Sequence, residues 1–445
     1  MTPQELFLIV MLVGLFAGIL SGIPAMLAIA GVPLVTAVIA AAFGAFDLAF
    51  LSFFPARVWG VMTNTLLMAV PLFVLMGVLA RMLGGSPRGM ALSVLAFSAM
   101  IAAATGIIGA TVVMLVLVAL GPMLAAGIAP RRASGLICAS GTLGQIIPPS
   151  ILLVLLGDQI GNTYLEAQQR AGNFAPQPVS VGDLFAGALI PGFLLVGLYL
   201  AYIVLMSFLR PESCPATPVP EDEKRGLWKE VLVAFFPPLI LIFAVLGSIL
   251  GGIATPTEAA SVGAVGATIL AALRWRLSRA VLVDVARRTA VITSMIFIIL
   301  FGASVFAIVF RQMGGDNLVR EFLTSMPGGA MGAMITVMII MFVLGFILDT
   351  FEIIFIVLPI TAPTLLLLGI DPVWLGVMIG VNLQTSFLTP PFGFSLFYLR
   401  GVAPNSVTTM MIYRGAVPFV GLQILAIAIL FIFPGIVTWL PSVLF

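Results

Sequence analysis

The sequence is short of charge, histidine and cysteine, and each shortage excludes a class of protein. Charged residues make up 8% of the 445 positions and hydrophobic residues 62%, so a soluble protein of this length could not keep its surface in water. Histidine is absent, which removes the usual proton shuttle and imidazole metal ligand. Cys138 and Cys214 make neither a disulfide framework nor a metal-binding cluster.

Two further absences concern energy and partners. The chain has no G-x-x-x-x-G-K-[ST] motif, so it does not hydrolyse ATP through a P-loop. Its net charge of +2 gives no reason to expect a nucleic-acid partner. Any energy coupling must therefore come from an ion gradient or from another protein.

What the chain does have is apolar runs of about 20 residues, each long enough to cross a lipid bilayer. We therefore predict an all-α polytopic membrane protein. The predicted spans are residues 5–21, 24–43, 60–82, 90–122, 132–157, 184–208, 230–251, 256–273, 290–311, 331–368, 373–398 and 412–439. Two of them, 90–122 and 331–368, would be about 50–57 Å long as helices against a hydrocarbon core of about 30 Å. A re-entrant hairpin fits each, and one long tilted helix is the alternative.

Two polar segments that end in a proline pair interrupt the apolar spans. They are Ser140-Gly-Thr-Leu-Gly-Gln-Ile-Ile-Pro-Pro149 and Asn382-Leu-Gln-Thr-Ser-Phe-Leu-Thr-Pro-Pro391. Each proline removes a backbone donor and clashes with the preceding turn. In a membrane, the freed backbone groups are tolerated only where they are buried in protein or line a wet cavity. Paired broken helices of this kind indicate the binding site of a secondary transporter.

The chain also repeats motifs at a fixed spacing. Pro148-Pro149 lies 242 positions before Pro390-Pro391, and Gly127-Ile-Ala-Pro130 lies the same distance before Gly369-Ile-Asp-Pro372. We interpret these matches as two repeats, because the motifs keep their order. The predicted organisation is a first repeat, 1–209, with hairpin 90–122 and broken helix 132–157; a cytoplasmic linker, 210–225; and a second repeat, 226–445, with hairpin 331–368 and broken helix 373–398.

Basic residues predict how these repeats are oriented. Loops 209–229 and 274–288 are rich in Lys and Arg and should be cytoplasmic. The matched elements then cross the membrane in opposite directions, which makes an inverted-topology repeat with one hairpin entering from each face. Arg311 and Arg320 fall on the outer side and count against this scheme, although acidic residues lie beside them.

Small and polar residues at the first break could bind a cation. Sodium prefers about five or six oxygen ligands, which hydroxyls and the carbonyls freed at a helix break supply. The candidates are Thr105, Gly106, Ser140, Gly141, Thr142 and Gly144. The alternative is that these residues allow close helix packing.

The second break is paired with a hairpin tip that carries two acids. Asp349 and Glu352 lie in apolar surroundings, where a carboxylate needs a cation, a polar partner or a proton. The candidates for a second cation site are Asp349, Thr350, Gln384, Thr385 and Thr389. The alternative is that one of the acids caps the second arm of the hairpin.

Two other charged residues have local explanations. Thr255-Pro256-Thr257-Glu258 has the pattern of a capping box at a helix start, so Glu258 should be structural. Arg400 follows the second break and should fix the topology, although a substrate carboxylate could use such a cation.

Three long motifs resemble one protein family. They are Gly135-Leu-Ile-Cys-Ala-Ser-Gly-Thr-Leu-Gly-Gln-Ile-Ile-Pro-Pro-Ser150, Gly252-Ile-Ala-Thr-Pro-Thr-Glu-Ala-Ala260 and Asn382-Leu-Gln-Thr-Ser-Phe-Leu-Thr-Pro-Pro-Phe-Gly393. They resemble the DctM-type large membrane subunit of tripartite ATP-independent periplasmic (TRAP) transporters, and the likeness runs over essentially the whole chain.

The resemblance implies a bacterial inner-membrane secondary transporter, not an enzyme. It implies two partners, a small four-helix membrane subunit and a periplasmic solute-binding protein, and sodium as the coupling ion with no other cofactor. Transport would be uptake of an organic acid by an elevator motion, in an ion-transporter-superfamily-like fold. Mapped onto this chain, the cation sites would fall at Thr105–Gly106 with Ser140–Gly144, and at Asp349–Thr350 with Gln384–Thr389. The substrate-binding residues that we expect between the breaks are Ser140, Pro148, Pro149, Asn382, Pro390 and Pro391.

Two alternative functions fit the residues less well. The permease of an ABC importer would carry E-A-A-x-x-x-G, but here Gly263 follows Glu258-Ala259-Ala260 one residue too early. An intramembrane aspartyl enzyme needs two acids on separate spans, whereas Asp349 and Glu352 share one hairpin.

Overall fold

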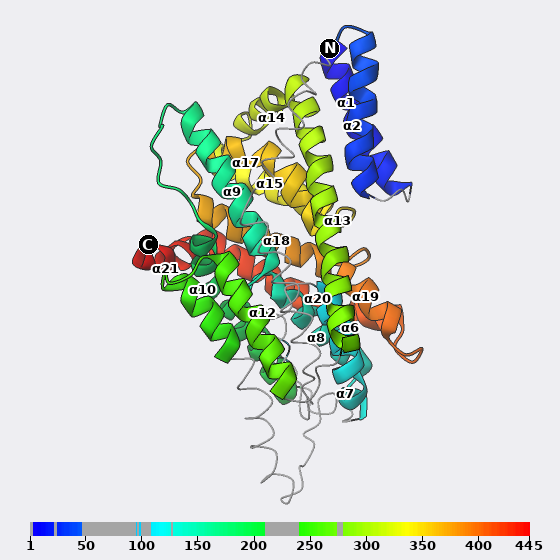
Figure 1. Cartoon of the computed structure of the whole chain (residues 1–445). Helices are drawn as coiled ribbons and strands as arrows, with labels where there is room; N and C mark the ends of the chain where they lie inside the picture. The colour runs from blue at the N-terminus through cyan, green and yellow to red at the C-terminus, as the bar shows by residue number, and fades with distance from the viewer. Residues whose placement is uncertain are drawn as a thin grey trace, which may run out of the picture. The chain divides into compact units, whose positions relative to one another are not determined.

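The computed structural model shows a helical protein (Figure 1). The residues that it describes are 3–21, 25–46, 95, 98, 108–125, 128–209, 240–273 and 279–445. No strand occurs within these ranges, as the apolar pattern predicts. The tip of the first predicted hairpin, with Thr105 and Gly106, lies outside the described residues.

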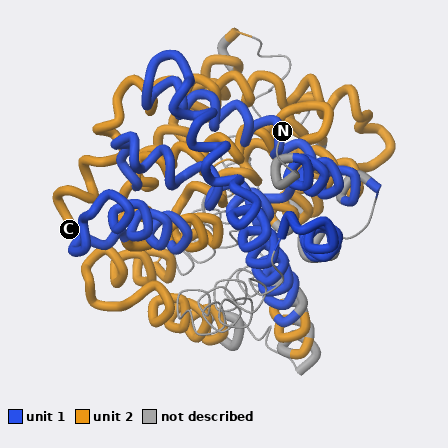
Figure 2. The backbone as a smooth tube through the Cα atoms, turned by 90° about the horizontal axis from the view of Figure 1, so that it is seen from above, with its two compact units in different colours: residues 1–68, 158–179, 290–372 blue, residues 69–157, 180–289, 373–445 orange. Residues whose placement is uncertain are grey.

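The chain forms two compact units (Figure 2). Unit 1 consists of residues 1–68, 158–179 and 290–372, and unit 2 of residues 69–157, 180–289 and 373–445. Each unit draws on both halves of the sequence, so the units are not the two predicted repeats. The repeats therefore stay a sequence-based prediction.

Unit 1 contains two groups of helices that pack together. Helices α1 and α2 form one pair, and α15 packs against α14 and α17. The bounds of these elements are α1 Pro3–Leu20, α2 Ala25–Ala42, α14 Gly315–Thr324, α15 Gly329–Leu344, α16 Thr350–Glu352, the π-helical turn η5 Ile353–Val357 and α17 Leu358–Leu367. The last part of α9 (Ile151–Arg170) and most of α13 (Arg279–Gln312) also belong to this unit.

The predicted hairpin 331–368 consists of two helical arms in unit 1. Helix α15 ends at Leu344, and the chain becomes helical again at Thr350. The second arm, α16 through α17, packs back on α15. The helix is thus interrupted beside the polar segment that the sequence suggests as the tip, and a single continuous helix does not form. The position of the tip within a membrane stays a prediction.

Unit 2 is built around the two proline-containing breaks. Helix α8 (Pro130–Thr142) is followed by a short 3-10 turn, η3 (Leu143–Gln145), and the chain becomes helical again at Ile151 as α9. Helix α18 (Pro372–Leu388) ends before the second proline pair, and α19 (Phe394–Val402) follows it. Both predicted segments are therefore interrupted helices.

The remaining helices of unit 2 pack around these breaks. Helix α20 packs along α8, and α10 packs against α20 and α21. The bounds are α6 Ile108–Leu115, the π-helical turn η2 Val116–Leu120, α7 Gly121–Ala125, α10 Val181–Leu209, a helix Ile240–Leu250, α12 Pro256–Leu273, α20 Thr409–Ile432 and α21 Gly435–Leu444.

Four helical stretches of the described residues are long and apolar enough to cross a membrane. They are Val181–Met206, Thr293–Gln312, Thr350–Leu367 and Thr409–Ile432. Helices α14 and α15 together form a further apolar pair, bent by 119°. This is the structure of a multi-pass membrane protein. The count is lower than the number of predicted spans because several spans lie outside the described residues and others are divided into short helices.

Candidate functional site

The first break is buried and is closed by local hydrogen bonds. Helix α8 begins with Pro130 in its first turn, where a missing N–H costs nothing. Thr142, at its end, is fully buried and donates its hydroxyl hydrogen bond to the Ala139 carbonyl (2.8 Å). Beyond the prolines, the Ser150 hydroxyl accepts from the Leu153 N–H (3.3 Å), which caps α9. The first break is thus a hydrogen-bonded turn between α8 and α9, in which Thr142 closes the end of α8 and Ser150 caps the start of α9.

The second break is closed in a similar way. The Ser395 hydroxyl donates to the Phe387 carbonyl across the break (2.8 Å). A methyl group at Gly393 would lie 2.5 Å from the same carbonyl oxygen, so only glycine fits there. Thr385 and Thr389 donate to carbonyls one turn earlier, at 2.8 and 2.7 Å. Their oxygen lone pairs remain available to a cation, because each hydroxyl uses only its proton in these bonds.

The two breaks meet at a pair of polar side chains. The Gln384 amide, on α18, donates to the Thr142 hydroxyl, on α8, at 3.3 Å. Both side chains are fully buried. The sequence places Thr142 in the first predicted cation site and Gln384 in the second. The structure brings these two residues into direct contact.

Two further polar residues complete this cluster, and the sequence analysis missed both. The Gln423 amide on α20 also reaches the Thr142 hydroxyl, at 3.5 Å. The Tyr199 hydroxyl on α10 lies beside the side chains of Gln423, Gln384 and Thr142 but meets none of them in hydrogen-bond geometry. The available signal was a polar side chain in the apolar middle of each long helix.

Glycine and proline positions around the first break serve packing. Gly141 lies against Val112 of α6, and a methyl group there would clash with that side chain. Ser140 and Gly144 are buried, as are Pro148 and Pro149. At the second break Asn382 is buried, Pro390 is half-buried and Pro391 is exposed. Gly141 therefore allows close packing, and the roles of all these residues in binding stay predictions.

The acids at the tip of the second hairpin form a capping box. The Asp349 carboxylate accepts from the Thr350 N–H (2.7 Å), and the Glu352 carboxylate accepts from the Asp349 N–H (3.1 Å). No salt bridge among the described residues reaches either carboxylate. The capping alternative thus holds for both acids, and it leaves other oxygen lone pairs of each carboxylate free for a cation.

The predicted second cation site draws on both units. Asp349 and Thr350 lie in unit 1, whereas Gln384, Thr385 and Thr389 lie in unit 2. That these residues share one site stays a prediction. No cluster of three or more His, Cys, Asp or Glu side chains occurs within the described ranges. A sodium site does not need one, because hydroxyl and carbonyl oxygens can supply its ligands.

The structure tests the explanation of Glu258 and shows a local contact of Arg400, whose role in fixing the topology stays a prediction. The Thr255 N–H donates to the Glu258 carboxylate (2.8 Å), and the Glu258 N–H donates to the Thr255 hydroxyl (3.3 Å). The predicted capping box is confirmed. The Arg400 guanidinium donates to the Val407 carbonyl (2.8 Å) and fixes the loop that follows α19.

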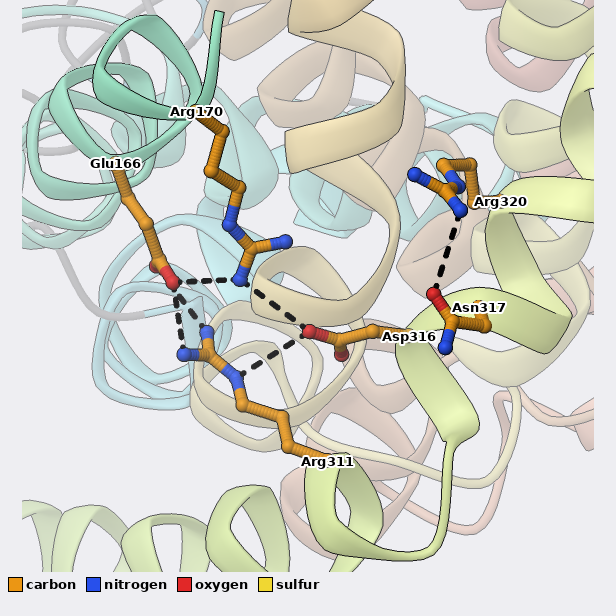
Figure 3. A network of polar contacts seen from close by, with 6 residues as sticks. All are labelled: Glu166, Arg170, Arg311, Asp316, Asn317 and Arg320. Atoms are coloured by element: carbon orange, nitrogen blue, oxygen red, sulfur yellow. Dashed lines mark hydrogen bonds and ion pairs between the residues drawn. The ribbon is translucent and has the colours of Figure 1, made fainter.

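An ion-pair network in unit 1 contains Arg311, one of the charges that count against the predicted orientation (Figure 3). Arg311, at the end of α13, meets both carboxylate oxygens of Glu166 at 2.9 and 3.2 Å. Arg170 bridges Glu166 (2.8 Å) and Asp316 (3.4 Å). Two acids thus pair with two arginines in this network, and the orientation of the chain in the membrane stays a prediction.

The same network affects the ionisation of Glu166. Partial burial of this carboxylate favours the neutral form, but the charges and hydrogen bonds of Arg311 and Arg170 outweigh burial and lower the pKa of Glu166 below its ordinary 4.5. The structure also extends a predicted element, because the segment after residue 157, where the predicted broken helix 132–157 ends, continues as helix α9 to Arg170. The polar composition of this segment is typical of a loop, but ion pairs stabilise the last turn of the helix.

Comparisons with known proteins give one consistent result. Residues 8–436 match the family described as "Tripartite ATP-independent periplasmic transporter, DctM component". The chain is 32% identical over 416 residues to the C4-dicarboxylate TRAP transporter large permease protein DctM of Vibrio cholerae, covering 85% of this chain and 86% of that protein. It is 27% identical over 401 residues to the ectoine TRAP transporter large permease protein TeaC of Halomonas elongata, covering 85% and 87%.

A solved structure has a similar fold. The YdaH transporter of Alcanivorax borkumensis matches with a TM-score of 0.59 over 86% of this chain and 88% of that chain. The sequence identity is 14%, so the likeness concerns the fold alone.

Proposed function

The chain belongs to the DctM component family of tripartite ATP-independent periplasmic transporters, and from this premise we propose that it is the permease of a sodium-driven importer of an organic acid. It is a large permease subunit, as its relatives are. A periplasmic binding protein and a small membrane subunit are the partners that the family implies. We propose that the small subunit has four helices and that the complex lies in the bacterial inner membrane.

The convergence of the two breaks is the observation that supports the proposal most strongly. Buried hydroxyl and amide groups lie at the ends of α8 and α18, and they touch through Thr142 and Gln384. Burying a polar group costs free energy unless it is hydrogen-bonded, so a cluster of such groups inside an apolar protein suggests a function. Helix breaks with such groups supply oxygen ligands for sodium in secondary transporters.

The proposed mechanism starts at the outer face. The binding protein delivers the substrate, and sodium ions bind at the two breaks and order them. Ordered breaks complete a substrate pocket between Pro148-Pro149 and Pro390-Pro391. The sodium gradient then drives the elevator motion of the hairpins and breaks, as an inverted-topology repeat permits.

The relatives suggest which substrates to test. One relative is named for C4-dicarboxylates and another for ectoine. We propose a carboxylate, with C4-dicarboxylates as the first candidates. Selectivity would rest largely on the binding protein, because it captures the substrate before the permease does.

Uptake into proteoliposomes tests the proposal. The chain and its small subunit are reconstituted, and the binding protein is added outside with a labelled C4-dicarboxylate. Uptake should require both the binding protein and an inward sodium gradient, and a potassium gradient of equal size is the control. Uptake that follows a proton gradient instead would overturn sodium coupling. Uptake that needs ATP and an ATPase would overturn the secondary-transport mechanism.

A further inference from the structure

The polar cluster of unit 2 joins the two broken helices to the long helices α10 and α20. Thr142 and Gln384 lie on the broken helices and touch at 3.3 Å. They are 242 positions apart, the spacing that separates the two proline pairs. Tyr199 lies on α10, and Gln423, on α20, reaches Thr142 at 3.5 Å. The cluster therefore has two members on the broken helices and two on the long helices.

The hydrogen bonds of this cluster are incomplete. All four side chains are fully buried. Among the described residues, the amide oxygens of Gln384 and Gln423 and the hydroxyl of Tyr199 have no hydrogen-bond partner. The Tyr199 hydroxyl has one proton and lies beside two amide side chains that each have an unpaired oxygen. Within the part of the chain that the structure describes, no hydrogen bond of Tyr199 therefore fixes a single arrangement of the cluster.

We propose that Tyr199 and Gln423 are positioning residues that couple the two breaks, so that a cation ordering one break favours ordering of the other. The path is short. Thr142 is the last residue of α8 before the first break, and Gln384 lies within the last two turns of α18 before the second. A rotamer change of Thr142 moves the acceptor of the Gln384 amide, and a rotamer change of Gln384 removes a donor from the Thr142 hydroxyl. Energetic coupling needs two discrete arrangements, and in this proposal the second is reached when the Gln384 or Gln423 amide turns toward the Tyr199 hydroxyl.

This inference rests on the proposed sodium coupling, and it makes a separate claim about cooperativity. If the breaks are coupled, the sodium dependence of uptake is sigmoidal, with a Hill coefficient above one. Loss of the coupling turns two cooperative sites into two independent sites. The Hill coefficient then falls toward one, and half-saturation needs roughly twofold more sodium, because losing a fivefold coupling between two sites, the low end of the usual range, moves the midpoint by about the square root of that factor.

Tyr199→Phe is the variant that tests the claim, and Tyr202→Phe is its matched control. Both tyrosines lie on α10, and both rings contact Phe419 edge-to-face, at centroid distances of 5.1 and 5.2 Å. Each change removes one hydroxyl and keeps the ring contact. Only the Tyr199 hydroxyl belongs to the cluster. Gln423→Met is a second variant, which removes the amide from α20 and keeps a side chain of similar length.

The experiment measures the initial rate of uptake against sodium concentration in the reconstituted three-component system, together with the melting temperature of each permease variant. We expect Tyr199→Phe and Gln423→Met to lower the Hill coefficient toward one, whereas Tyr202→Phe retains the wild-type curve. If the wild type is cooperative, and folded Tyr199→Phe and Gln423→Met keep the same Hill coefficient, the inference is wrong. The proposed function would be unaffected by that result. A wild type that transports without sodium would overturn the proposed function and the inference with it.

Discussion

At the scale of single residues, one acid has two roles that a substitution can separate. Asp349 accepts the Thr350 N–H as a helix cap, and we propose that it also binds a cation. Capping depends on a side-chain oxygen, which asparagine also offers. Cation binding in an apolar site gains most from the charge.

Asp349→Asn should therefore retain stability and lose sodium-dependent uptake. Asp349→Ala should lose both, with about 1 kcal/mol of stability removed with the cap. Melting temperature and uptake, measured on the same preparations, distinguish the two roles. An Asp349→Asn variant with an unchanged sodium curve would show that Asp349 serves only as a cap.

The ion-pair network gives a second residue-scale prediction. The pKa of Glu166 is lower in the folded protein than its ordinary 4.5, so the charged carboxylate stabilises the fold above that pH. This stabilisation is lost as the pH falls through the lower, folded-state pKa. With the side chain about one-third exposed, solvent screening limits the contribution to about 1 kcal/mol or less.

Glu166→Gln should thus lower the melting temperature near pH 7 and match the wild type at low pH. Glu321→Gln, at an exposed position on α14, is the control and should change little at either pH. The comparison needs only purified protein in detergent. An equal difference between wild type and Glu166→Gln at all pH values would contradict the assigned ion pairs.

At the scale of elements, the closest approach in unit 2 is between α8 and α20. A methyl group at Gly415 would overlap the Arg131 carbonyl oxygen. A methyl group at Gly135 would overlap the Gly415 carbonyl oxygen. Both obstacles are backbone atoms, which cannot move aside as a side chain can. Glycine at these positions therefore lets the two helices pack directly against each other.

Gly415→Ala should destabilise the protein by roughly 1–3 kcal/mol, as overpacking does. Gly421→Ala on the same helix is the matched control, because a methyl group there has no atom within 4 Å. It should be neutral or slightly stabilising, since alanine favours a helix over glycine. Equal melting temperatures for the two variants would contradict the packing of α8 on α20.

Elements also show what could be predicted from the sequence. The two interrupted helices and the Glu258 capping box depend on residues within one or two turns, so the local sequence predicts them. The helix from 158 to Arg170 was missed, because its polar residues resemble a loop and its end is held by Arg311, far along the chain. Tyr199 and Gln423 were missed for a similar reason, since only tertiary packing brings them to Thr142.

At the scale of the whole molecule, the two compact units each combine segments from both halves of the sequence. The predicted repeats and the observed units are thus different divisions of one chain. Composition alone was sufficient to predict a membrane protein, because few soluble folds tolerate so few charged residues. The grouping of segments into units depends on long-range packing, which spacing alone does not encode.

The central claim is that sodium and substrate move together through this permease. Coupling is reciprocal for binding free energies, so substrate should drive sodium as sodium drives substrate. The measurement is sodium influx into proteoliposomes that hold the permease and its small subunit, with equal sodium on both sides and loaded binding protein added outside. We predict sodium influx when the binding protein carries substrate, and no influx when the binding protein is added without substrate. Substrate uptake without any sodium influx would contradict the account.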